Sequence, residues 1–195
     1  TILFWSSALI VVNSRFLIEV PALGGSIHEG IMGTPRFINP VLATSPQDLD
    51  LTSLIYAGLT KRSMDGEYIP DMAEAITVSD DGLIYEITLK SKAKFHDGSK
   101  VTTDDILYTI NLVQNPRIKS PQFIKWEGVR VEKISDTELR FSLKKPYPLF
   151  AEVLSLGILP KNLWKNLSDE QFSLSDYNIH PIGSGPFVIE SIDSV

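Results

Sequence analysis

The sequence predicts a mixed α/β domain, of the α/β or α+β layered kind, in which strand hairpins alternate with separate helices. Apolar and polar residues alternate over residues 83–90 and 139–143, and each stretch follows a turn cluster. Residues 45–58 and 102–115 instead carry helix-start residues followed by apolar residues at helical spacing. A period of two is typical of half-buried strands, and the longer spacing is typical of amphipathic helices.

The first predicted helix begins after Ser45 and stops near Gly58. Ser45 suits the N-cap, proline follows it at the first helical position, and Asp48 favours the positive end of the helix. The apolar face of this helix is predicted to consist of Leu51, Leu54 and Ile55.

A first hairpin is predicted around the turn cluster at residues 79–82. Ile76 and Val78 precede this turn. Alternation then continues on the far side of the turn, where the apolar positions are Leu83, Tyr85, Ile87 and Leu89. This pattern indicates two antiparallel strands with one buried face.

The second predicted helix follows this hairpin and opens at Thr102 or Thr103. Thr102 and Asp105 have the spacing of a capping box, with aspartate in the usual glutamate place. Ile106, Ile110 and Val113 lie on one predicted face, and Asn115-Pro116 ends the helix.

The rest of the chain is predicted to add one more hairpin and shorter pieces. Residues 129–134 and 139–143 form the second hairpin, and residues 146–154 form a short apolar helix. A tight loop at residues 182–186 then feeds a strand at residues 187–189.

The N-terminal region permits two interpretations. The first twelve residues are uncharged but too short to span a membrane alone, since a span needs about 20 apolar residues. We expect residues 1–15 to be the remnant of a membrane anchor or signal segment, although a buried strand or helix is the alternative. Residues 16–25 would then be a connector, residues 26–33 a strand with a glycine exit, and residues 34–44 irregular.

Composition excludes several classes of function. The 195-residue chain carries 24 acidic and 18 basic residues, a net charge of −6, which argues against a nucleic-acid-binding surface. It has no cysteine, so disulfides, thiolate metal sites and cysteine nucleophiles are excluded.

No histidine or carboxylate pattern predicts a catalytic or metal site. The three histidines, His28, His96 and His180, lack helical ligand spacing. His96 is predicted to shape its turn or to face water. Asp104 and Asp105 fall in the first turn of a predicted helix, where capping explains them without acid–base chemistry.

Ser184 is not predicted to be a nucleophile. It lies in Gly183-Ser184-Gly185, which lacks the complete G-x-S-x-G pattern, and a strand is expected after it where a nucleophile elbow needs a helix. The glycines are better explained by a sharp backbone turn or by close approach to a ligand.

Several stretches in the same order resemble the extracytoplasmic solute-binding proteins of ABC importers, in the peptide and nickel binding family (family 5). The resemblance covers residues 26–189. It is carried by Asn39-Pro40, the run from Leu54 to Leu59, the runs Asp81–Tyr85, Lys94–Gly98 and Val101–Ile106, the run Leu143–Tyr147, and Gly183-Ser184-Gly185-Pro186-Phe187. The last run has Ser and Phe where the family usually has Thr and Tyr.

The resemblance implies a periplasmic-binding-protein-like lobe from a two-lobed Venus-flytrap protein outside the cytoplasmic membrane. Residues 26–195 would be an incomplete N-terminal lobe. The implied function is to bind a peptide and deliver it to the permease subunits, as a monomer, without a cofactor, metal, nucleic acid or catalytic residue. The alternatives are a carrier of a nickel complex or oligosaccharide with the same fold, or a hydrolase.

Two segments are candidates for contact with the ligand, because each places glycine-permitted backbone beside a predicted strand end. Added strands can capture peptide backbone at such places, although simple tight turns would also explain them. The candidate residues are Gly33, Thr34, Arg36, Phe37, Asn39, Gly183, Ser184 and Gly185.

Overall fold

The computed structural model describes residue 26 and residues 28–192. Contacts divide the chain into one unit of residues 1–31 and another of residues 32–195. The described residues of the first unit have no helix or strand. The predicted anchor at residues 1–15 and the connector at residues 16–25 lie outside the described part. Within that part, no helix has the length and apolar character needed to cross a membrane.

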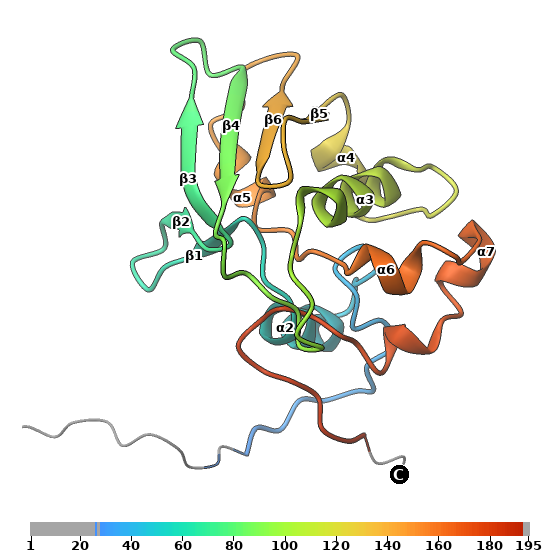
Figure 1. The fold of residues 1–195 in the computed structure, drawn as a ribbon. Helices are drawn as coiled ribbons and strands as arrows, with labels where there is room; N and C mark the ends of the chain where they lie inside the picture. The colour runs from blue at the N-terminus through green and yellow to red at the C-terminus, as the bar shows by residue number, and fades with distance from the viewer. Residues whose placement is uncertain (1–25, 27, 193–195) are drawn as a thin grey trace, which may run out of the picture. The chain divides into compact units, whose positions relative to one another are not determined.

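A four-stranded antiparallel sheet is the main layer of the second unit (Figure 1). Its order is β3-β4-β6-β5, and its strands are β3 (Ala73–Val78), β4 (Ile84–Leu89), β6 (Glu138–Ser142) and β5 (Arg130–Lys133). Both predicted hairpins are therefore confirmed, and β4 pairs with β6 at the centre of the sheet.

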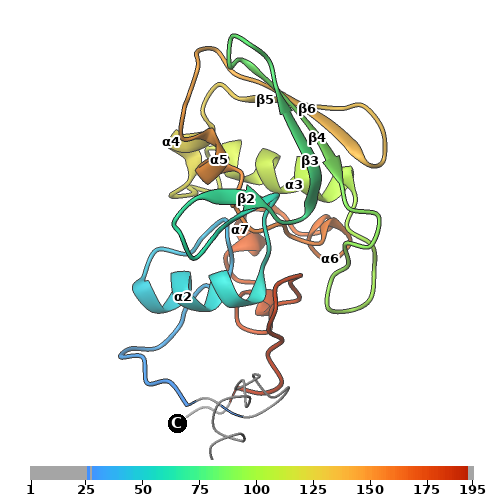
Figure 2. The ribbon, with the colours of Figure 1, turned by 90° about the vertical axis from the view of Figure 1, so that its left-hand side faces the viewer.

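Helices cover one face of this sheet. They are α3 (Thr103–Gln114), α4 (Phe123–Trp126) and α5 (Phe150–Val153), as Figure 2 shows from the side. Tyr85, Trp126 and Phe141 surround the buried Phe150 ring, with centroid separations of 4.8, 6.0 and 6.0 Å. The predicted inward residues of α3, Ile106, Ile110 and Val113, are also buried in this core.

The opposite side of the structure is a second group of helices around α2 (Pro46–Ile55). It includes α6 (Lys161–Trp164), α7 (Asp169–Phe172) and the 3₁₀-helix η1 (Asp176–Asn178). The rings of Trp164 and Phe172 lie 4.7 Å apart and are almost completely buried. These short helices escaped sequence prediction because single-turn helices carry too few periods to be recognised.

The caps of α2 and α3 follow the sequence prediction. Asp48 N donates to Ser45 Oγ over 3.2 Å at the start of α2. At the start of α3, the Thr102 backbone N and hydroxyl donate to Asp105 Oδ2 over 2.8 and 2.7 Å. Helix α2 ends at Ile55, earlier than its predicted stop.

The predicted inner face of α2 is wrong in part. The side chains that α2 buries are Asp48, Thr52 and Ile55, whereas Leu54 is 37% exposed. The polar Asp48 faces inward because it accepts backbone hydrogen bonds from a neighbouring segment, which the helical pattern of α2 alone does not reveal.

Two predicted strands are not formed, and one hairpin was missed. The described residues of 26–33 and all of 187–189 lack strand structure, since neither pairs with another strand in the described part of the chain. The missed hairpin joins β1 (Thr60–Arg62) to β2 (Tyr68–Pro70). Its strands have three residues each, too few for alternation to be detected.

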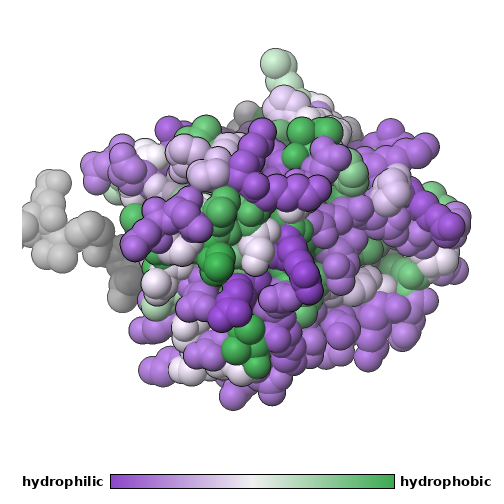
Figure 3. Space-filling model, turned by 90° about the horizontal axis from the view of Figure 1, so that it is seen from above, coloured by the Kyte–Doolittle hydropathy of each residue, from purple (hydrophilic) through white to green (hydrophobic). Residues whose placement is uncertain are grey.

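Seen from above, the molecular surface is mostly hydrophilic, with hydrophobic residues in small separate patches (Figure 3). No broad apolar face appears on this side of the described structure. A recess lies between the sheet and α2.

Candidate ligand-binding cleft

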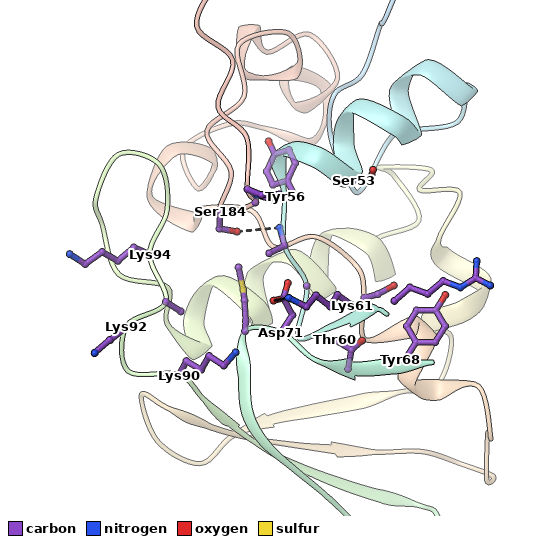
Figure 4. A pocket seen from close by; sticks show the side chains of 18 residues that line it. Ser53, Tyr56, Thr60, Lys61, Tyr68, Asp71, Lys90, Lys92, Lys94 and Ser184 are labelled. Atoms are coloured by element: carbon purple, nitrogen blue, oxygen red, sulfur yellow. Dashed lines mark hydrogen bonds and ion pairs between the residues drawn. The ribbon is translucent and has the colours of Figure 1, made fainter. Parts of the chain in front are cut away.

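An open cleft of about 750 Å³ lies between the sheet and α2 (Figure 4). Its floor comes from residues 56–58, directly after α2, together with Ser155. The β1–β2 hairpin forms one wall, residues 90–94 form another, and residues 184–186 form an edge. This volume is within the range of small-molecule sites.

The residues 183–185 dock on the end of α2. Ser184 N and Gly185 N both donate to Ile55 O, over 3.0 and 2.8 Å, and Ala57 N donates to Ser184 Oγ over 3.4 Å. The last carbonyl groups of a helix have no partner within the helix, and here the loop supplies hydrogen-bond donors to the Ile55 carbonyl at the end of α2. Ser184 and Gly185 line the cleft, and their N–H groups are used within the protein.

His96 holds the same loop from the other side. Gly183 N donates to His96 Nδ1 over 3.3 Å, and His96 Nε2 lies 3.0 Å from Gly185 O. His96 N also donates to Gly183 O over 2.8 Å. A neutral imidazole with its proton on Nε2 satisfies both ring contacts, so the residue joins two loops that are distant in sequence.

The predicted segment 33–39 lies outside this cleft. Gly33 takes φ +104°, which suits glycine, and Gly33, Thr34 and Arg36 are exposed. Arg36 lies over the ring of Phe37 at 5.2 Å. None of these residues lines the described cleft, so their proposed contact with ligand is independent of it.

Asp48 fixes the backbone of this segment. Arg36 N and Phe37 N donate to Asp48 Oδ1 over 2.7 and 3.0 Å. Burial alone would raise the pKa of Asp48, but these backbone donors outweigh it and lower the pKa below its ordinary 3.8. Asp48 therefore adds stability that is present above its ordinary pKa and is lost as the pH falls through the lower folded value.

Asn39, one of the candidate ligand contacts, is a buried residue. It is fully buried, its Nδ2 donates to Asn178 Oδ1 over 2.9 Å, and its Oδ1 accepts from Val41 N over 2.9 Å. Both ends of the amide form hydrogen bonds within the protein, so the Asn39 side chain ties its segment to η1.

A smaller cavity of about 220 Å³ adjoins the cleft and shares four residues with it: Ser53, Tyr56, Tyr68 and Ser155. Thr52 and Tyr56 both line it. Within the described structure, their buried hydroxyl oxygens have no hydrogen-bond partner. Burial also raises the pKa of Tyr56 strongly, so its hydroxyl stays protonated.

Replacing Tyr56 by phenylalanine should leave the free energy of unfolding unchanged or raise it by up to about 1 kcal/mol, because the change removes an unpartnered buried hydroxyl. Urea denaturation measures the effect. Ser120→Ala is the matched control, since the Ser120 hydroxyl donates to Val41 O over 2.6 Å and its loss should cost about 1 kcal/mol. An equal loss of unfolding free energy in the Tyr56 and Ser120 variants would mean that the Tyr56 hydroxyl has a hydrogen-bond partner.

The carboxylates considered for catalysis have structural partners. Asp105 caps α3, and Asp104 Oδ2 lies 3.1 Å from Lys133 Nζ. Among the described residues, no three histidine, aspartate or glutamate side chains gather as a metal site.

Sequence reasoning missed the charge of the cleft. Five basic residues line it and only one acidic residue does: Lys61, Arg62, Lys90, Lys92 and Lys94, with Asp71. The alternate lysines at residues 90–94 are visible in the sequence and could have signalled this charge. The sequence does not show that the β1–β2 hairpin folds beside these lysines.

The chain matches known proteins over most of its length. Residues 67–194 match the family described as bacterial extracellular solute-binding proteins, family 5 Middle. The oligopeptide-binding protein AppA of Bacillus subtilis is 33% identical over 171 residues, covering 86% of this chain and 32% of AppA.

Solved structures are similar in both sequence and fold. AppA from B. subtilis with a nonapeptide has a TM-score of 0.77 at 30% identity, covering 84% of this chain and 33% of that one. NikZ from Campylobacter jejuni with Ni(L-His) has a TM-score of 0.71 at 32% identity, covering 83% and 31%. The chain thus spans about a third of the length of these relatives.

The family match covers more than half of the chain, and the hairpins and helices predicted from the quoted motifs are present in the fold. The resemblance seen in the sequence is therefore confirmed, and the mixed α/β structure is that of two-lobed periplasmic binding proteins. The chain belongs to the bacterial extracellular solute-binding proteins of family 5.

Proposed function

We propose that this chain is part of the first lobe of an extracytoplasmic binding protein that captures peptides and delivers them to the permease of an ABC importer. The observation that carries the proposal is the open cleft beside the docked residues 183–185, in a chain similar to AppA, an oligopeptide-binding protein. We also propose that residues 1–15 belong to an anchor or signal segment and that residues 26–195 belong to the lobe.

The binding surface would be formed jointly by this lobe and a second one. The cleft is open, and one lobe by itself cannot close over a ligand or exclude water from it. Each hydrogen bond from a second lobe to a charged group of the ligand would contribute about 1.5–3 kcal/mol. The proposed ligand contacts of residues 33–37 and 183–185 belong to this picture, whereas buried Asn39 does not.

The 195-residue chain alone should therefore fold but bind peptides weakly, whereas a longer product that carries a second lobe should bind them well. Calorimetric titration of both with a mixed library of short peptides tests this. Tight, saturable binding by the chain alone would contradict the two-lobe proposal. Steady hydrolysis of the library that is lost in Ser184→Ala, with the fold intact, would favour the hydrolase alternative.

A second candidate is transport of a nickel complex, because NikZ with Ni(L-His) is as similar in sequence as AppA. The same titration with Ni²⁺ and histidine separates the two. Saturable binding of the nickel complex, without binding of peptides, would replace the peptide proposal.

A further inference from the structure

The two ring contacts of His96 with residues 183–185 fix the protonation state of the imidazole. Gly183 N donates to His96 Nδ1 over 3.3 Å, and His96 Nε2 lies 3.0 Å from Gly185 O. A backbone N–H can only donate and a carbonyl oxygen can only accept, so Nδ1 must be unprotonated and Nε2 must carry the proton. Both contacts therefore exist together only when the imidazole is neutral.

A protonated imidazole keeps one of these contacts and loses the other. Both of its ring nitrogens are donors, so Nε2 still donates to Gly185 O, whereas Nδ1 turns a donor toward the Gly183 N–H. Gly183 is buried, and its amide has no other hydrogen-bond partner among residues 28–192. Protonation of His96 thus leaves a donor unsatisfied in a place that water reaches poorly, which is unfavourable.

The other attachments of this loop do not depend on the ring. Ser184 N and Gly185 N donate to Ile55 O over 3.0 and 2.8 Å, and His96 N donates to Gly183 O over 2.8 Å. The backbone atoms of these bonds do not titrate. Protonation of His96 therefore frees the Gly183 amide and loosens that side of the loop, while Ser184 and Gly185 stay on the end of α2.

The segments packed against the ring bring no other charge that changes in mild acid. Residues 51–57 at the end of α2 and residues 183–189 contain no histidine and no charged residue. Tyr56 is the one titratable side chain in these two segments, and burial raises its pKa, so it stays protonated. The loop and the end of α2 therefore meet His96 with the same charge across the range in which histidines titrate.

The turn that carries His96 also keeps its charge in this range. Lys94 and Lys100 lie on either side of the turn and form a backbone bridge with each other. The hydroxyl and backbone N of Ser99 donate to Asp97 Oδ1 over 2.6 and 2.9 Å. These bonds lower the pKa of Asp97 below its ordinary 3.8, so Asp97 stays ionised in mild acid. The imidazole is therefore the group of this contact whose charge changes.

We propose that His96 is a pH-sensitive latch of the cleft edge, whose neutral imidazole holds Gly183 and whose protonated form releases it. The loop is fully docked above the pH range in which histidine titrates and is loosened below it. Ser184 and Gly185 line the cleft, so mild acid changes the order of its edge. This inference goes beyond the proposed function and does not depend on it, because every readout lies within this chain.

The test measures backbone amide hydrogen exchange of the ¹⁵N-labelled 195-residue chain at about pH 7.5 and about pH 5.5, corrected for the intrinsic effect of pH on exchange. We expect protection of the Gly183 amide to fall about tenfold in mild acid, as for the loss of one acceptor from a buried donor. Protection of the Ser184 and Gly185 amides should fall less, because they keep Ile55 O as acceptor. The ring ¹⁵N resonances of His96 should titrate together with the Gly183 amide shift.

Two variants separate the latch from a general effect of acid. In His96→Asn, the side-chain oxygen replaces Nδ1 as acceptor for Gly183 N and gains no proton in this range, so Gly183 should stay protected at both pH values. His180→Asn is the matched control. His180 lies close to the loop in sequence, but its exposed ring pairs with Asp176 Oδ2 over 3.1 Å. This variant should keep the full pH response of Gly183.

Three outcomes would overturn the latch. They are equal protection of Gly183 at both pH values while the His96 ring titrates, a pH response that persists in His96→Asn, and a response that disappears in His180→Asn. The first comparison uses the unaltered chain, so it does not depend on how well a variant folds. The proposed function is decided separately, by the calorimetric comparison of the one-lobe and two-lobe proteins at a single pH.

Discussion

Asp105→Ala is expected to lower the free energy of unfolding by at least about 3 kcal/mol. Asp105 is only 6% exposed, and its carboxylate accepts three hydrogen bonds. Its Oδ2 accepts from the backbone N and hydroxyl of Thr102, and its Oδ1 accepts from Lys161 N over 2.9 Å. Alanine would leave these donors without a partner in a place that water reaches poorly.

Asp104→Ala is the control for this experiment. Asp104 is the neighbouring residue on α3, but its side chain is half exposed and pairs with the Lys133 side chain. Its loss should cost less than about 1 kcal/mol, as is usual for surface ion pairs. Asp105→Asn should fall between the two, since an amide keeps only one acceptor oxygen. Urea denaturation of the three variants measures these changes in the free energy of unfolding. Equal losses of that free energy in Asp104→Ala and Asp105→Ala would contradict the capping role of Asp105.

Gly183→Ala is expected to destabilise the protein by about 3 kcal/mol and to disturb the edge of the cleft. A methyl group on Gly183 would collide with the carbonyl oxygen of Ile55, the same oxygen that accepts hydrogen bonds from Ser184 N and Gly185 N. Both groups in this collision belong to the backbone and cannot rotate away as a side chain could. The loop at residues 183–185 would therefore have to move away from the end of α2.

Displacement of the loop at residues 183–185 should also be detectable by NMR at His96. The two ring contacts of His96 with Gly183 and Gly185 would be lost, so the ¹⁵N resonances of the imidazole should change in Gly183→Ala. Gly30→Ala is the control, because nothing lies within 4 Å of a methyl group added there, and its effect should stay within about 0.5 kcal/mol. A stable Gly183→Ala variant with unchanged histidine resonances would refute the docked arrangement.

The elements that the sequence predicted correctly are those whose signals are local. Both hairpins of the sheet have alternation interrupted by a turn, and α3 has its cap and its apolar face within fourteen residues. Such patterns work because side-chain direction follows directly from the period of the backbone.

The wrongly predicted strand at residues 187–189 and the wrong part of the inner face of α2 share one physical cause. Residues 187–189 have the composition of a strand, but a strand exists only where another strand accepts its hydrogen bonds. Likewise, Asp48 turned inward on α2 because Arg36 and Phe37 supply it with donors from outside the helix. Pairing partners distant in sequence leave no trace in a local pattern.

In the candidate site, too, some features follow from local sequence patterns and others depend on contacts between distant residues. The sequence by itself determined that residues 182–186 form a glycine-containing loop, that Asp104 and Asp105 begin a helix, and that family motifs run through the chain. Only the tertiary structure decided that His96 holds that loop, that Asn39 is buried against Asn178, and that Arg62 and Lys90 line one cleft. The contacts of His96 and Asn39 join residues 87–139 positions apart, and which residues meet over that distance depends on how the sheet and helices pack.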